Sequence, residues 1–180
     1  MRSVLRKKML LALKIILPTL YLATLVFIFG NSLQTGAQSS ASSSRVVDWI
    51  QGIFKRIAPH SKIATATGED YLRLHEAIRI LAHFAEFAVL GGLSAGCCLV
   101  YNAPKKYEYL GVGSTLFVPI LDEMLQYFTA GRAAQFGDVL VDIIGGTAGF
   151  FCVIALCYFI RKGIEKNQTP KKEKEHGERE

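Results

Sequence analysis

Polar and ionisable side chains occur within three otherwise apolar segments of this sequence, and their types could support chemistry. They are Arg79, His83 and Glu86 in residues 78–101, Asp122, Glu123 and Gln126 in residues 109–128, and Asp142 in residues 139–160. An imidazole beside carboxylates can act as a general acid or base. The same donor types can hold a divalent metal ion. Because ionisable groups are costly in apolar surroundings, we take these residues first as candidates for a functional site.

Helical spacing would place these side chains on shared faces. Arg79, His83 and Glu86 follow one another at intervals of four and three residues, so they would line one stripe of a helix. A four-residue spacing also relates two further pairs, Asp122 with Gln126 and Asp138 with Asp142. Between these pairs lies Arg132, whose guanidinium could bind a phosphate or a carboxylate with two hydrogen bonds.

The composition indicates which elements must carry these residues. Of the 180 residues, 51% are hydrophobic and 20% are charged, and the mean hydropathy is +0.28. The apolar residues are gathered into blocks long enough to cross a bilayer, which takes roughly 20 helical residues. We therefore predict an all-α integral membrane protein with a single membrane domain, residues 1–160. Its four spans are expected at residues 10–29, 78–101, 109–128 and 139–160.

The basic residues predict the orientation of these spans. They precede the first span, separate the second from the third and follow the fourth, as Arg2, Arg6, Lys7, Lys8, Lys105, Lys106, Arg161, Lys162 and Lys166. With four spans all of them lie on one side, which should be cytoplasmic, so both termini are expected there. This assignment also accounts for the net charge of +6 without nucleic acid as a partner. The first block is longer than the core of a cleaved signal peptide, so we interpret it as an anchor.

Three other segments have distinct compositions. Residues 31–44 are rich in Ser, Gln and Gly, which favours a flexible external segment. Residues 46–58 repeat apolar side chains at helical spacing and predict a short amphipathic helix, either in the outer membrane interface or packed on the outer ends of the bundle. Residues 161–180 are expected to form a disordered, charged cytoplasmic tail.

The depths of the polar residues agree with one another. Helical rise places His83 roughly 7 Å and Glu86 roughly 12 Å inside their span. Asp122 lies roughly 9 Å from the end of the third span, and Asp142 roughly 5 Å from the start of the fourth. The sequence therefore predicts one shallow polar layer near the external face, forming an outward-facing pocket.

The sequence resembles the VanZ-like family of bacterial membrane proteins over residues 20–155. The resemblance rests on the segments at residues 29–32 (FGNS), 82–87 (AHFAEF) and 122–128 (DEMLQYF), and on Gly131, Arg132, Asp138 and Asp142. At Asp142 many relatives would be expected to have asparagine, and at Arg79 the basic residue could be lysine. The resemblance implies a place in the bacterial cytoplasmic membrane and a role in resistance to the glycopeptide teicoplanin. It implies a process and does not specify a reaction.

Three hypotheses follow for the polar layer. As an enzyme, it would modify an envelope lipid or cell-wall precursor, using a candidate acid and base cluster of His83, Glu86, Asp122 and Glu123, which are also the candidate metal ligands. As a binding or transport site, it would hold a membrane lipid, a cell-wall precursor or a glycopeptide-related ligand through Arg79, Gln126, Arg132, Asp138 and Asp142.

As a structural element, it would only hold helices in register, by pairs such as Asp122 or Glu123 with Arg132 and Glu86 with Arg79. The acids outnumber the bases in the layer, and this favours a bound cation, a proton or a cationic ligand over a fixed ion-pair network. No nucleophilic Ser or Cys is evident beside His83.

Overall fold

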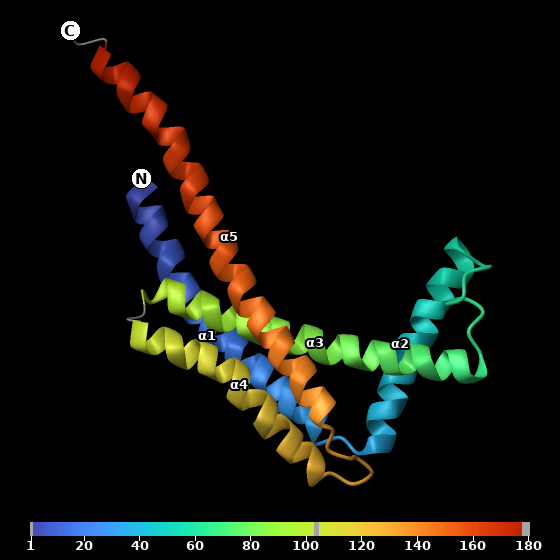
Figure 1. Cartoon of the computed structure of the whole chain (residues 1–180). Helices are drawn as coiled ribbons and strands as arrows, with labels where there is room; N and C mark the ends of the chain where they lie inside the picture. The colour runs from blue at the N-terminus through green and yellow to red at the C-terminus, as the bar shows by residue number, and fades with distance from the viewer. Residues whose placement is uncertain (1, 103–104, 178–180) are drawn as a thin grey trace.

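The structure, a computed structural model, describes residues 2–102 and 105–177. The described part of the chain is all-α, as predicted, and contains five helices. They are α1 (Arg2–Ser32), α2 (Gly36–Ile57), α3 (Gly68–Val100), α4 (Lys105–Tyr127) and α5 (Phe136–Gly177) (Figure 1).

Three of these helices are long and apolar enough to cross a membrane. They correspond to Val4–Ser32 in α1, the whole of α3, and Phe136–Ile164 in α5. The described residues of α4 are less hydrophobic than these three helices, because Asp122, Glu123 and Gln126 lie in the last two turns of α4. α4 nevertheless covers nearly all of the span expected at residues 109–128.

Helix α3 is the centre of the fold and contacts all four other helices. Its contact with α5 is the closest, because glycines allow the two backbones to touch. A methyl group at Gly91 would overlap the carbonyl oxygen of Gly146, and one at Gly149 would overlap that of Ala88. Close approach through small residues is the packing mode expected of helices in a membrane.

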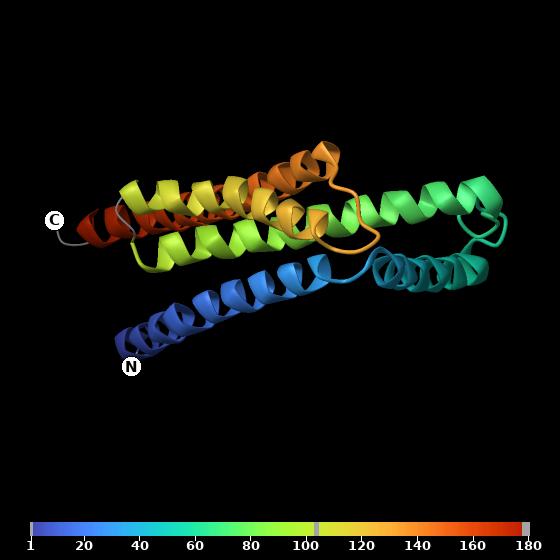
Figure 2. The ribbon, with the colours of Figure 1, turned by 90° about the horizontal axis from the view of Figure 1, so that it is seen from below.

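Helix α2 lies beside the first half of α3, outside the four-helix bundle (Figures 1 and 2). The prediction of a flexible segment is wrong for residues 36–44, which form the first turns of this helix. A capping box explains the helix start, since Thr35 Oγ1 accepts from Gln38 N at 3.3 Å and Thr35 N donates to Gln38 Oε1 at 3.0 Å. His75 of α3 also contacts the carbonyl oxygen of Ser40 at 3.2 Å. The expected helix at residues 46–58 forms the second half of α2.

The two ends of the bundle carry different parts of the chain (Figures 1 and 2). The start of α1, the end of α3, the start of α4 and the far end of α5 lie at one end. The connection from α1 to α2 (residues 33–35) and the α4–α5 loop (residues 128–135) lie at the other. Helix α5 continues to Gly177, and the disorder expected for residues 161–180 stays a prediction.

Candidate functional site

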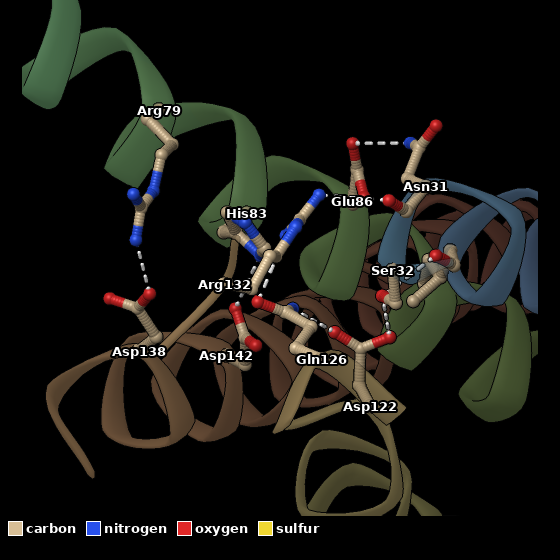
Figure 3. A network of polar contacts seen from close by, with 11 residues as sticks. Asn31, Ser32, Arg79, His83, Glu86, Asp122, Gln126, Arg132, Asp138 and Asp142 are labelled. Atoms are coloured by element: carbon tan, nitrogen blue, oxygen red, sulfur yellow. Dashed lines mark hydrogen bonds and ion pairs between the residues drawn. The ribbon is translucent and has the colours of Figure 1, made fainter. Parts of the chain in front are cut away.

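A cluster of polar side chains lies where α1 and α4 end and α5 begins, against the middle of α3 (Figure 3). Its least exposed members are Ser32, Asp122, Glu123, Gln126 and Asp142. Asp122 and Asp142 are the most deeply buried of these five. Because buried carboxylates need partners, the contacts of each one decide what the cluster can do.

Asp122 is held at both of its carboxylate oxygens. The Ser32 hydroxyl contacts Oδ1, and Gln126 Nε2 donates to Oδ2 at 2.8 Å. The Gln126 contact is the i, i+4 pair that the sequence predicts. Ser32 comes from the end of α1, 90 positions away in the chain, so this carboxylate fixes α4 against α1.

Arg132 joins the α4–α5 loop to the end of α1. Its Nε donates to Gln34 O at 3.1 Å and its Nη2 to Asn31 O at 2.9 Å. Its Nη1 donates to Gln126 Oε1 at 2.9 Å. The guanidinium therefore has a preset position, which reduces the ordering cost of binding a ligand. Burial and the nearby charge of Arg79 lower the pKa of Arg132 from its usual value, although neighbouring carboxylates oppose this.

The loop can reach this position because of two glycines. Gly131 has a φ of +73°, in the left-handed region that favours glycine. A methyl group at Gly36, the first residue of α2, would overlap the carbonyl oxygen of Gly131. In addition, Gly36 N donates to Ala130 O at 3.0 Å. The start of α2 and the α4–α5 loop are thus directly apposed.

Arg79 and Glu86, two α3 side chains at the edges of the cluster, pair with different helices. Arg79 Nη2 donates to Asp138 Oδ2 at 2.6 Å, linking α3 to the start of α5. Glu86 Oε1 accepts from Asn31 Nδ2 at 3.3 Å, linking α3 to α1. The pairs suggested for the structural hypothesis are therefore wrong. Arg79 binds Asp138 instead of Glu86, and Arg132 binds Gln126 and backbone carbonyls instead of Asp122 or Glu123.

His83 and Asp142 face each other without a good hydrogen bond (Figure 3). His83 Nδ1 lies 3.5 Å from Asp142 Oδ1, which is longer than a normal N–H···O bond. His83 Nδ1 and both Asp142 carboxylate oxygens are buried and have no hydrogen-bond partner. His83, Asp122 and Asp142 each offer a ligand atom, and these atoms lie within 4.8 Å of one another.

Glu123 points to the α4–α5 loop. Its Oε1 accepts a hydrogen bond from Gln135 N, while its buried Oε2 has no hydrogen-bond partner. Of the four predicted metal ligands, His83 and Asp122 belong to the close group of three. Among the described residues Asp142, and neither Glu86 nor Glu123, completes that group.

Two cavities adjoin the cluster. One of about 320 Å³ lies between the start of α2 and the α4–α5 loop, and one of about 120 Å³ lies between α1, α2 and α3. Arg79, Arg132 and Ser39 line both of them. His83 and Glu86 line the smaller one. Two guanidinium groups thus face shared space beside the carboxylate cluster.

The structure brings all nine predicted site residues to this one region of the fold. The prediction missed Asn31, Ser32 and Gln34, which connect α1 to Glu86, Asp122 and Arg132. The FGNS segment at residues 29–32 was a signal for them, because two polar residues there end an apolar block. It also missed Ser39, which lies in the segment expected to be flexible.

Fold and site together define an all-α protein with membrane-length helices and a buried carboxylate, histidine and arginine cluster at one end of its bundle. The family model described as VanZ/LLP1 matches residues 17–160. The chain belongs to this family, as the resemblance in the sequence implies. No curated protein and no solved structure matches the chain.

Proposed function

We propose that this chain is a four-span protein of the bacterial cytoplasmic membrane that binds an anionic headgroup in an outward-facing pocket. The headgroup would belong to an envelope lipid or a peptidoglycan precursor. Its binding or modification would contribute to resistance to glycopeptides such as teicoplanin. One observation carries the proposal: Arg79 and Arg132, from different elements, line the same two cavities.

In the proposed topology α4 is the third of the four spans, after α1 and α3 and before α5. α4 packs on α1, α3 and α5, so it would cross the membrane with them. Basic residues lie in the first turns of α1, at the start of α4 and after the apolar part of α5. They are then on one side, and the positive-inside rule makes that side cytoplasmic. The cluster and both cavities lie toward the opposite, external end.

In this topology α2 would lie in the outer interface. Trp49 and Ile57 are 68% and 71% exposed, and Lys55 and Arg56 occupy the last turn of the helix. An exposed tryptophan with apolar neighbours and basic residues is the composition of a helix at headgroup depth.

The chemistry favours a phosphate or a carboxylate as ligand. Guanidinium groups bind both with paired, charge-assisted hydrogen bonds. Arg132 is already fixed by three contacts, and Arg79 is 38% exposed at the cavity wall. The larger cavity, about 320 Å³, is at the lower end of the range of roughly 300–1,000 Å³ for small-molecule sites. A headgroup fits this volume better than a whole glycopeptide, so resistance would act through the target of the drug.

Modification of the bound headgroup is the second candidate function. The observation that favours it is His83, which lines the smaller cavity and faces Asp142. A histidine supported by a carboxylate can act as a general base. Product formation from a labelled precursor by the reconstituted chain would distinguish modification from binding alone.

The proposal is tested by expressing the full chain in a teicoplanin-susceptible bacterium. The wild type should raise the minimal inhibitory concentration, and Arg132→Ala, His83→Ala and Glu123→Gln should each abolish the increase at equal membrane abundance. Arg73→Ala is the matched control, because Arg73 is an exposed arginine of α3 that pairs only with exposed Glu69 at 3.8 Å. Full resistance from all three site variants would contradict the assignment of the pocket.

A further inference from the structure

Three side chains from three helices converge behind the smaller cavity. His83 comes from α3, Asp122 from α4 and Asp142 from α5. Their ligand atoms lie within 4.8 Å of one another. His83 also lines the 120 Å³ cavity, so the group has an access route from the site described above.

Asp142 is the member whose carboxylate has no hydrogen-bond partner among the described residues. Its side chain is only 1% exposed, and its charged neighbour is His83, with Nδ1 at 3.5 Å. An ionised carboxylate in that state is very costly unless a proton or a cation, either a protonated His83 or a bound ion, compensates it. Arg79 is engaged with Asp138, one turn earlier on α5.

The distance between His83 and Asp142 bears on how the charge of Asp142 is compensated. At 3.5 Å, Nδ1 and Oδ1 are too far apart for a normal hydrogen bond. Two ligands bound at about 2.0–2.1 Å to a tetrahedral metal ion lie roughly 3.3 Å apart. The separation is therefore compatible with an ion between the two groups as well as with a direct ion pair.

Asp122 is oriented in the way that metal-binding carboxylates usually are. Ser32 and Gln126 hold its two oxygens, and such outer hydrogen bonds fix a ligand toward its ion. Each carboxylate oxygen has two lone pairs, so both oxygens keep capacity for a further partner.

We propose that His83, Asp122 and Asp142 form a binding site for one first-row divalent cation, such as Zn²⁺ or Mn²⁺. One imidazole with two carboxylates favours these ions over Mg²⁺ or Ca²⁺, which prefer oxygen ligands alone. Two ionised carboxylates also balance the charge of the ion. The site stands on its own contacts and does not depend on the headgroup proposal.

The experiment uses the full chain, purified in mild detergent without a polyhistidine tag. After treatment with EDTA, the protein is dialysed against Zn²⁺ or Mn²⁺, and metal per chain is measured by mass spectrometry. The wild type should bind about one ion per chain, and the ion should raise its melting temperature. Asp142→Asn should weaken the affinity by 10-fold to 100-fold or more.

Asp48→Asn is the matched control, because it makes the same exchange at an exposed position on α2, outside the proposed ligand set. It should retain metal binding. His83→Gln provides a second ligand variant, and the melting temperature of each variant in EDTA shows that it is folded. The proposal is overturned if the folded wild type takes up no ion, or if Asp48→Asn and Asp142→Asn lose binding equally.

Discussion

Arg132 donates a hydrogen bond of 2.9 Å to Gln126, and the same amide group donates at 2.8 Å to the fully buried Asp122. Arg132, one of the two arginines that line both cavities, is thereby connected to a fully buried carboxylate through one side chain. A substitution at Asp122 or Gln126 should therefore alter the position of Arg132 in the cavity walls, although Asp122 itself is buried.

Asp122→Asn should destabilise the protein although it preserves the shape of the side chain. Ser32 and Gln126 both contribute hydrogen-bond donors to the carboxylate, but an amide accepts at only one oxygen. The NH2 group of asparagine replaces one accepting oxygen, so one charge-assisted hydrogen bond is lost, at a cost of about 1–3 kcal/mol. Ser32 keeps a second acceptor, the carbonyl oxygen of Ile28 at 3.1 Å. The loss should appear as a lower midpoint in chemical unfolding of the detergent-solubilised protein. Asp48→Asn, an exposed site on α2, should leave that midpoint unchanged.

Arg132→Lys should behave like Arg132→Ala in headgroup binding. The guanidinium contacts Gln126, Gln34 and Asn31 through three different nitrogens. A lysine side chain ends in a single nitrogen and cannot make all three contacts simultaneously. We expect the affinity for a labelled anionic lipid in nanodiscs to fall by at least roughly 10-fold, or about 1.4 kcal/mol. Arg73→Lys is the control for the same exchange elsewhere on α3. Wild-type affinity in Arg132→Lys would show that charge alone is sufficient.

Asp138→Asn should change headgroup binding in the opposite direction to Arg79→Ala. Asp138 neutralises the guanidinium of Arg79 through a contact of 2.6 Å, so it competes with an incoming anion. Its removal should raise the affinity for an anionic lipid several-fold, while Arg79→Ala lowers it. The same lipid titration measures both variants. A fall in affinity for Asp138→Asn would instead make the ion pair a positioning contact.

Adjacent glycines on α3 should differ sharply in their tolerance of a methyl group. Gly91→Ala overlaps the backbone of Gly146 on α5, whereas a methyl group at Gly92 meets Val153 at 3.4 Å and the carbonyl oxygen of Gly149 at 3.6 Å, both ordinary contacts. Overpacking of this kind costs about 1–3 kcal/mol. Gly91→Ala should therefore lower the melting temperature clearly and Gly92→Ala much less. Equal effects would contradict the close contact between α3 and α5.

The main features of the fold could be predicted because membrane helices are recognised in a sequence by their length and hydropathy. The blocks at residues 10–29 and 139–160 lie within α1 and α5, and the block at residues 78–101 ends one residue beyond α3. These are the three helices of spanning length and composition. The Ser-rich residues 36–44 were misjudged, because composition does not report the capping box at Thr35 or the contact with His75. The capping box and the contact with α3 explain why that segment is helical.

The polar cluster lies where the sequence predicts one, and the Asp122–Gln126 pair follows from its spacing, but the other pairings were not predicted. Depth along each helix was sufficient to place His83, Asp122 and Asp142 in one layer, since helical rise is constant. Which side chains meet depends on the rotation of each helix about its axis, and glycine contacts such as Gly149 on Ala88 set that rotation. For this reason Arg79 binds Asp138, and Ser32 reaches Asp122 across 90 positions of sequence.

The central claim is that Arg79 and Arg132 together bind one anionic headgroup. Its most direct test is the equilibrium binding of labelled phosphatidylglycerol to the full chain in phosphatidylcholine nanodiscs, with a labelled lipid-linked peptidoglycan precursor as a second probe. At least one probe should bind saturably to the wild type and should lose that binding in Arg79→Ala/Arg132→Ala, while Arg73→Ala binds like the wild type. Equal affinity of the wild type and the double variant for both probes would contradict the account.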